Sequence, residues 1–381
     1  YVTPSEMLGD RYGSRGVAVT VAVLSCLFLI PYSAVQLMGI GYLLEGLTGG
    51  DISFLTGVAV AAVVAVAWAY IAGLRSVAWT DSLQSLVMMI SAVAVIVLVV
   101  RALGGPGAFA ATLERDYAAW LTVPGPGYFD LSTFIGLSLP WFFFSISNPQ
   151  VSQRLFVPRS IATMRTMVLG FLVFGFIYTL VSIIWGYSAL VMFPGLENPD
   201  LATPTLLSSG VVPPLLALLV MLGITAAAIS TVDSILLTLS SMVSRDVYGN
   251  MAPHGTESHQ LLAGRLVIPV IAILAFLFAR LQLDLIAILS VASSAGLLVM
   301  VPAIVGAFYW RRGSAAGALA SMLAGAVVVL VTQFGGYRPL GQWPGVWGLA
   351  VATVTYLGVS LATTPATAGA NRFDAALERG S

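Results

Sequence analysis

Hydroxyl and carboxylate side chains are concentrated in one strongly apolar segment of this chain, between residues 223 and 237. Ser230, Thr231 and Ser234 supply hydroxyl oxygens there, and Asp233 supplies the only carboxylate of the segment. A charge at membrane depth costs about 2.5–3.5 kcal/mol on insertion scales and usually marks an ion or substrate path. Oxygen atoms are the ligands that hard cations prefer. The segment is therefore a candidate site for an alkali cation.

The spacing of the small and hydroxyl residues places them on one helical face. Steps of three or four residues lead from Ala227 to the pair Ser230 and Thr231, and then to Ser234, Thr238 and Ser241. Membrane helices also use such stripes for close packing, and that interpretation covers Ala227, Thr238 and Ser241. It does not account for Asp233, at the edge of the face, because packing needs no carboxylate. A sodium ion held by two hydroxyls and a nearby carbonyl would still need oxygens from another helix.

A second carboxylate, Asp81, opens another apolar run and follows Thr80. An acidic residue in the first turn of a helix is an ordinary N-terminal arrangement. On its own, Asp81 is therefore a weaker candidate for a functional residue than Asp233.

Two prolines, Pro140 and Pro149, interrupt a third apolar run. Proline removes a backbone donor and clashes with the preceding helical turn. Ser145, Ser147 and Asn148 lie between the prolines and could satisfy the freed backbone groups. The pattern favours a broken helix, which in transporters marks the binding site. A proline kink in an ordinary packing helix is the alternative.

The composition predicts that these segments lie in a lipid bilayer. The chain is 59% hydrophobic and 8% charged, and its mean hydropathy is +0.97, whereas a soluble domain is about 25% charged. The formal net charge is zero, so no long-range field favours nucleic acid as a partner. Cys26 is the only cysteine, which excludes an intrachain disulfide. No obligate protein partner is inferred.

Apolar runs of sufficient length predict ten membrane-spanning helices. We expect them at about 16–47, 51–72, 80–103, 133–156, 163–193, 211–242, 261–281, 284–309, 314–334 and 343–364. With a cytoplasmic N-terminus, the inside segments hold Arg11, Arg15, Arg75, Arg154, Arg159, Arg165, Arg245, Arg265, Arg311, Arg312, Arg372 and Arg379. The outside segments then hold only Arg101, Arg115, Arg280 and Arg338. This bias is typical of cytoplasmic loops, and it places both ends of the chain in the cytoplasm.

Three motifs follow one another along the chain. They are Ala72-Gly-Leu-Arg-Ser-Val-Ala-Trp-Thr-Asp-Ser-Leu-Gln84, Asn148-Pro-Gln-Val-Ser-Gln-Arg154, and Ala227-Ala-Ile-Ser-Thr-Val-Asp-Ser234 with a later Ser-Arg-Asp-Val-Tyr248. In order and spacing they resemble the sodium/solute symporter family over essentially the whole chain. This family includes carriers for proline, pantothenate, sugars, sialic acid and monocarboxylates. Ala72 stands where the family signature has its first glycine.

The resemblance implies an all-α membrane protein of the LeuT type, in which two inverted helix repeats alternate the access to a central site. It implies a sodium ion, the co-transported ion, at Ala227, Ser230 and Thr231. In some members a further cation site uses the residues that match Asp81, Asp233 and Ser234. The solute pocket takes side chains that match Trp141, Phe144, Ser145 and Asn148, with weaker contributions from Tyr32 and Gln36.

The resemblance also divides the single transporter domain, 1–381, into parts. These are a cytoplasmic N-terminal segment at 1–15, a remnant of the first repeat at 16–103, the second repeat at 133–309, two accessory helices at 314–364, and a cytoplasmic tail at 365–381. The family has two core helices before the region that matches Tyr1. We therefore expect the chain to be a fragment of a longer transporter.

Sodium-coupled symport of a small organic solute is the function that the resemblance implies, in the bacterial cytoplasmic (inner) membrane. The apolar run from Trp141 to Phe144 favours an amino acid or an organic acid. A proton-coupled carrier, with Asp233 or Asp81 titrating, and a solute-sensing membrane domain are the alternatives. An enzyme is not expected, because the chain has no His-Glu-x-x-His and no Gly-x-Ser-x-Gly motif, and His254 and His259 fall in a polar loop.

Overall fold

A computed structural model describes residues 1–71, 74–125, 129–251, 256–282 and 286–380. These residues form helices joined by turns, and no β-strand occurs among them. Within this described part, nine helical segments are long and apolar enough to cross a membrane. They are Arg15–Leu47, Phe54–Ile71, Trp79–Ala102, Ile161–Met192, Pro214–Met251, Glu257–Ala279, Leu289–Tyr309, Ala315–Phe334 and Pro344–Ala362. Nine of the ten expected spans are thus confirmed as long helices, and the span expected at 133–156 has another form.

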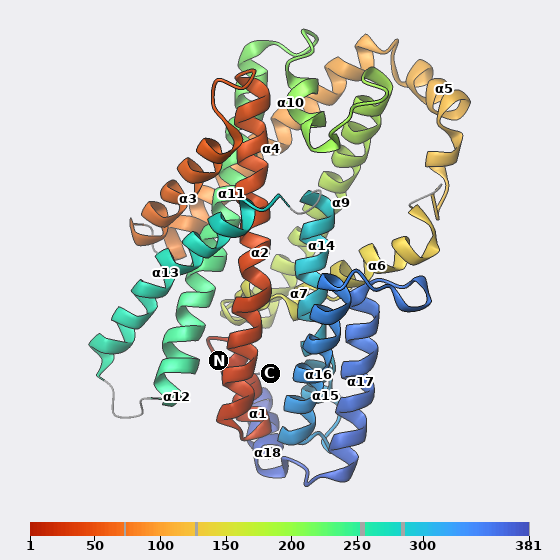
Figure 1. Ribbon diagram of the computed structural model, residues 1–381. Helices are drawn as coiled ribbons and strands as arrows, with labels where there is room; N and C mark the ends of the chain where they lie inside the picture. The colour runs from red at the N-terminus through yellow and green to blue at the C-terminus, as the bar shows by residue number, and fades with distance from the viewer. Residues whose placement is uncertain (72–73, 126–128, 252–255, 283–285, 381) are drawn as a thin grey trace.

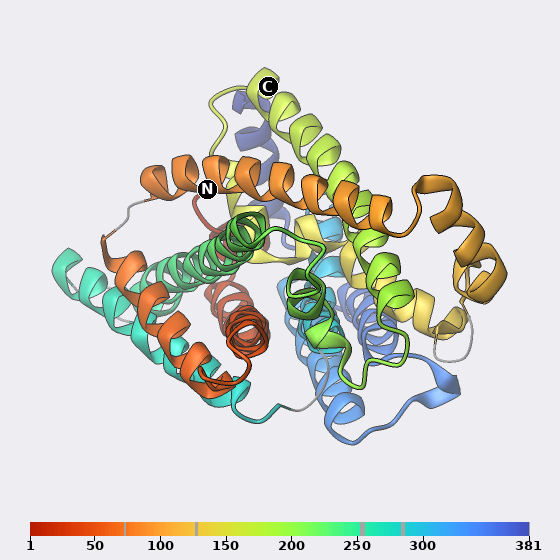
Figure 2. The same ribbon diagram turned by 90° about the horizontal axis from the view of Figure 1, so that it is seen from above.

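The longest helix, α2 (Arg15–Leu47), runs through the middle of the bundle (Figures 1 and 2). It packs against α3 (Phe54–Ile71), α11 (Pro214–Met242) and α13 (Glu257–Ala279) on one side. On another side it meets α14 (Ile286–Leu297) and α16 (Ala315–Phe334). Side chains of α2 such as Leu29, Leu37 and Met38 are fully buried, so the helix forms the centre of the apolar core.

Three further long helices and the short helix α15 surround this centre. They are α4 (Leu74–Ala102), α9 (Ile161–Met192), α15 (Val301–Tyr309) and α17 (Pro344–Ala362). Most side chains of α9 are exposed, and many of these are large and apolar. A helix that is apolar on all sides yet unburied by protein is suited to contact with lipid. A short 3₁₀ turn, η6 (Leu298–Met300), joins α14 to α15 within one span.

The expected broken helix is confirmed. In place of one rod, the chain forms α6 (Leu131–Phe142), α7 (Phe144–Ser147), α8 (Pro149–Ser152) and η3 (Gln153–Phe156). Asn148 between α7 and α8 has the extended values φ −88° and ψ 112°. The cause is local, because the ring of Pro149 disfavours the helical conformation of the residue before it. The Asn148 side chain then accepts a hydrogen bond from the Gln150 backbone N–H and caps α8.

Several shorter elements lie outside the spans. Near one end of the bundle are α1 (Pro4–Tyr12), α12 (Gly249–Met251) and α18 (Thr367–Gly380), and we call this the α1 end (Figure 1). The opposite end, with α5 (Pro106–Asp116) and α10 (Ala202–Leu207), is the α5 end (Figure 1). Three further 3₁₀ turns are η1 (Ala118–Leu121), η4 (Pro199–Leu201) and η7 (Pro339–Gly341).

Two boundaries differ from the sequence-based expectation. The span expected to end at 242 continues through the π-helical turn η5 (Val243–Tyr248) into α12. The polar segment at 365–381 contains the helix α18, whose Phe373 is only 1% exposed. The sequences of η5 with α12 and of α18 are too polar or too short to be recognised as part of a span. Packing against other helices stabilises these elements.

Candidate functional site

The hydroxyls of Ser230 and Thr231 converge on one backbone carbonyl of α11. Ser230 Oγ donates to the Ala227 oxygen at 3.1 Å, and Thr231 Oγ1 donates to the same oxygen at 2.9 Å. All three residues are partly buried. Both hydrogen bonds are those that helical Ser and Thr side chains commonly make to the carbonyl three or four residues earlier, and they place three oxygens on one turn. Hydroxyl and carbonyl oxygens are hard ligands, and such ligands suit a hard cation.

Asp233 is fully buried, with 0% of its surface exposed. Neither of its carboxylate oxygens has a hydrogen-bond partner among the residues that the structure describes. An unpartnered polar atom in an apolar interior is costly. The position of Asp233 is therefore not explained by helix packing, and the two oxygens remain available to a cation or a proton.

Close packing of α4 on α11 brings the second carboxylate to this site. A Cβ atom added to Gly223 would lie 3.1 Å from the Met88 backbone, so a larger residue would require the two helices to move apart by a few tenths of an ångström. Asp81 precedes Met88 by seven residues on α4, and Ser230 follows Gly223 by seven residues on α11. Asp81 and Ser230 lie beside each other. Seven residues are about two turns, which returns each helix to the same face.

Arg154 completes the polar cluster from the broken helix. Its Nη2 donates a hydrogen bond to Ser234 Oγ and lies 4.0 Å from Asp81 Oδ2. The structure thus brings Asp81, Ser230 and Ser234 together between α4, α11 and η3, with the charge of Asp233 close enough to interact with that of Asp81. No local pattern in the sequence marks Arg154 as a site residue, although it ends the motif that starts at Asn148.

Three of the expected solute-binding side chains form an aromatic row. The ring centroids of Tyr32 and Phe144 are 6.1 Å apart, and those of Phe144 and Trp141 are 4.8 Å apart. Tyr32 is buried, Phe144 is partly buried, and Trp141 is 44% exposed. The row therefore runs from the core on α2 to an accessible position on α6.

The other expected solute-binding residues are placed less uniformly. Gln36 lies one turn beyond Tyr32 and is partly buried, whereas Ser145 is exposed. Asn148 is fully buried, and its Nδ2 has no partner among the described residues. Because α8 contacts α11, the broken helix packs against the helix that carries the oxygen cluster.

His259 lies exposed in the first turn of α13 rather than in a loop. His254 lies outside the described residues, as do Ala72 and Gly73 of the first motif.

A bundle of membrane-spanning helices around a broken helix and an unpartnered intramembrane carboxylate defines a helical membrane transporter. A family model described as the sodium:solute symporter family matches residues 1–325. The chain belongs to this family.

Individual relatives agree with this assignment. The chain is 28% identical to the sodium/pantothenate symporter of Escherichia coli (strain K12) over 369 residues, which are 93% of this chain and 74% of that protein. It is 26% identical to the sodium/proline symporter of Haemophilus influenzae over 346 residues, which are 86% of this chain and 67% of the relative. The fold matches a solved structure of a Na⁺-coupled sialic acid symporter in a substrate-bound outward-open state, with a TM-score of 0.75 and 19% identity. That match covers 95% of this chain and 78% of the other, and it bears on the fold alone.

Proposed function

We propose that this membrane protein, a sodium-coupled symporter of small organic solutes by its family, transports an amino acid or an organic acid by alternating access. Membership of the sodium:solute symporter family supports the coupling to sodium. The observation that carries the proposal is the convergence of the Ser230 and Thr231 hydroxyls on the Ala227 carbonyl. No enzymatic activity is part of the proposal.

In this proposal a sodium ion binds at Ala227, Ser230 and Thr231. A hard cation takes oxygen ligands from several elements, so further oxygens complete its coordination. Asp81, Asp233 and Ser234 belong to a second cation site. In the present arrangement the guanidinium of Arg154 engages two of those residues, so occupation of the second site requires Arg154 to move.

The solute binds along the broken helix in this proposal. Trp141, Phe144 and Tyr32 provide an apolar wall, in which neighbouring rings contact each other at tilted angles. Ser145, Gln36 and the free Nδ2 of Asn148 provide polar contacts. A small solute with one polar and one apolar part matches this combination. The names of the relatives, which are symporters for proline and pantothenate, support a carboxylate-bearing solute.

Sodium drives the cycle because it binds together with the solute and leaves down its own gradient. One sodium ion that crosses ~100 mV releases about 2.3 kcal/mol. A tenfold concentration gradient adds about 1.4 kcal/mol. The sum sustains a solute accumulation of roughly 500-fold per sodium ion. Coupling requires that each ligand stabilises a state to which the other also contributes.

The orientation is part of the proposal. The arginine distribution supports placing the α1 end, with both ends of the chain, in the cytoplasm. The bacterial origin of the relatives supports the inner membrane. The lipid bilayer and the solute are the only partners that the proposal requires.

A proton-coupled carrier is the second candidate, since Asp233 is a buried carboxylate without a hydrogen-bond partner among the described residues. Uptake into proteoliposomes separates the two functions. Labelled amino acids and organic acids are offered with an inward sodium gradient, and then with choline in place of sodium and an inward proton gradient. We expect accumulation of at least one solute with sodium only. Equal uptake under choline would contradict sodium coupling and favour the proton.

A further inference from the structure

The connection between α16 and α17 contacts the first half of the broken helix. Ser132 Oγ, in the first turn of α6, donates a hydrogen bond to the Gly341 backbone oxygen. From the same connection, Trp343 Nε1 donates to Thr133 Oγ1 at 3.4 Å. These two hydrogen bonds join residues that are more than 200 positions apart, where α6 and the connection lie side by side (Figure 1).

The tightest contact between the two segments is at Gly136 of α6. A Cβ atom added to this glycine would lie 2.2 Å from Cγ, 2.4 Å from Cδ1 and 2.6 Å from Cβ of Trp343. Real Cβ atoms essentially never approach another atom within 3.0 Å. The Trp343 side chain, which is 3% exposed, thus fills the space beside Gly136, and even an alanine there would force α6 or the indole to shift.

Gly136 belongs to the buried face of α6. Thr133, Gly136 and Pro140 are the buried residues of this helix, and their spacing of three and four places them on one side. Trp141, the next residue, is 44% exposed. The contact with Trp343 therefore holds α6 by its buried face and leaves the Trp141 ring of the aromatic row accessible.

Trp343 is itself held in place from two sides. It is the N-cap residue of α17 and precedes Pro344, so its backbone belongs to the start of that helix. A Cβ atom added to Gly345 would lie 2.8 Å from Cβ of Ala295, so this start packs tightly on α14. The Arg338 guanidinium carbon lies 4.2 Å from the Trp343 ring centroid, as in a cation–π contact. The indole therefore attaches α6 to the α14 and α17 helices.

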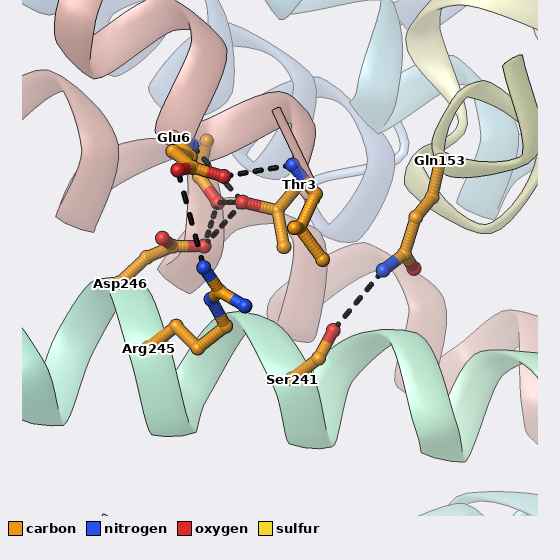
Figure 3. Close-up of polar contacts among 8 residues, drawn as sticks. Thr3, Glu6, Gln153, Ser241, Arg245 and Asp246 are labelled. Atoms are coloured by element: carbon orange, nitrogen blue, oxygen red, sulfur yellow. Dashed lines mark hydrogen bonds and ion pairs between the residues drawn. The ribbon is translucent and has the colours of Figure 1, made fainter. Parts of the chain in front are cut away.

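The second half of the broken helix is attached to a different helix, α11. Gln153 Nε2 donates to Ser241 Oγ at 3.3 Å (Figure 3), and Arg154 donates to Ser234 Oγ. Residues 144–148, which carry part of the proposed solute site, lie between these contacts and those of Trp343. The geometry of this segment thus depends on one attachment to α17 and another to α11.

We infer that Trp343 is a positioning residue for the solute, because by filling the space beside Gly136 it holds α6 and Trp141 in the place where the solute binds. The inference rests on the proposed function for the binding of the solute to the aromatic row. The attachment of α6 rests on the contacts of Trp343 with Thr133 and Gly136. Loss of the indole should therefore displace α6 and weaken solute binding, while the sodium site on α11 keeps its oxygens.

Uptake kinetics test the role in solute binding. The probes are the labelled amino acids and organic acids of the proteoliposome assay, with an inward sodium gradient. We expect Trp343→Ala to raise the half-saturating solute concentration about tenfold, because α6 then keeps its binding-competent place for only about a tenth of the time. Trp343→Phe retains the Cβ and ring atoms that fill the space and should stay close to the parent. The sodium concentration for half-maximal binding without solute should not change in either variant.

A distance measurement tests the attachment without any solute. Because Cys26 is the only cysteine, Cys26→Ser gives a background for spin labels at Leu131→Cys on α6 and Val354→Cys on α17, where the native residues are 58% and 71% exposed. We expect Trp343→Ala to broaden or shift the distance distribution that electron–electron double resonance reports. Leu340→Ala is the control for both experiments, since Leu340 lies in the same connection and is 87% exposed, and it should match the parent.

A second variant guards against misfolding of Trp343→Ala. Gly136→Ala leaves the tryptophan in place and adds one methyl group beside it, and it should reproduce both effects. Unchanged distance distributions in the two variants would overturn the attachment. Parental half-saturating concentrations in both, together with a raised value in Trp141→Ala, would overturn the positioning role alone. A parental value in Trp141→Ala as well would overturn the proposed solute site, and the positioning role with it.

Discussion

Arg154 Nη2 lies 4.0 Å from Asp81 Oδ2, and the same nitrogen donates to Ser234 Oγ. The guanidinium thus occupies two of the three residues proposed for the second cation site. Arg154 is 47% exposed as a side chain, so its attraction to Asp81 is screened and is worth about 1 kcal/mol or less. The Arg154 guanidinium and a cation would thus compete for Asp81 and Ser234. A weak competition suits a site that must bind and release its ion during a transport cycle.

Replacement of the Arg154 guanidinium should therefore raise the affinity for sodium. We predict that Arg154→Gln lowers the sodium concentration for half-maximal binding by about three- to fivefold, the equivalent of ~1 kcal/mol. The measurement is the sodium titration of tryptophan fluorescence in detergent. Arg159→Gln is the matched control, because Arg159 is exposed and lies five residues away. Equal sodium affinities in the two variants and the parent would contradict a second site at Asp81 and Ser234.

The buried carboxylate of Asp233 should contribute to function at the expense of stability. Asp233→Asn keeps the shape of the side chain and removes its charge. We predict that sodium no longer stimulates uptake in this variant, while the melting temperature stays the same or rises, because an uncompensated buried group is costly. Thermal unfolding and sodium-dependent uptake are measured on the same preparation. Normal sodium-driven uptake by Asp233→Asn would contradict a role of this carboxylate in sodium coupling and would indicate a purely structural role.

The aromatic row should determine the affinity for the solute. Trp141→Ala removes the ring whose centroid lies 4.8 Å from that of Phe144, at a tilt of 39°, and aromatic contacts are worth about 0.5–1.5 kcal/mol beyond area burial. We expect the half-saturating solute concentration to rise about tenfold. The sodium affinity measured without solute should not change. Trp68→Ala on α3, where the ring is 40% exposed, serves as the control and should leave both values unaltered.

The contact between α4 and α11 should be sensitive to side-chain size. At Gly223 a Cβ would meet the Met88 backbone at 3.1 Å, whereas nothing lies within 4 Å of a Cβ at Gly175 on α9. We predict that Gly223→Val lowers the free energy of unfolding by about 1–3 kcal/mol through overpacking and weakens sodium binding by separating Asp81 from Ser230. Gly175→Val should do neither. A Gly223→Val protein with parental stability and sodium affinity would contradict this packing.

Local signals in the sequence account for much of the fold. The lengths of the apolar runs predicted the long spans, and Pro140 with Pro149 predicted the broken helix, because both effects depend on residues that are adjacent in the chain. The spacing of Ser230 and Thr231 likewise placed their hydroxyls on one turn.

Contacts between distant segments were not predictable in this way. The approach of Arg154 to Asp81 depends on how η3 packs against α4, and no local pattern encodes it. The attachment of Thr3 and Ser5 to Asp246 joins residues that are more than 240 positions apart. The polar composition of residues 365–381 predicted a tail, as in a solvated segment. The structure shows a helix there, α18, because Phe373 is buried against the bundle.

The central claim is that the Ser230 and Thr231 hydroxyls bind the sodium ion that drives uptake. The most direct test is the sodium dependence of solute uptake in Ser230→Ala and Thr231→Ala, each compared with Ser240→Ala, whose hydroxyl bonds to the Gly264 oxygen on α13 instead. A hydrogen-bonding group that contacts a charge is worth about 1.5–3 kcal/mol. We therefore predict that each of the first two variants needs at least roughly tenfold more sodium for half-maximal uptake, while Ser240→Ala behaves like the parent. Unchanged sodium requirements in both Ser230→Ala and Thr231→Ala would contradict the account.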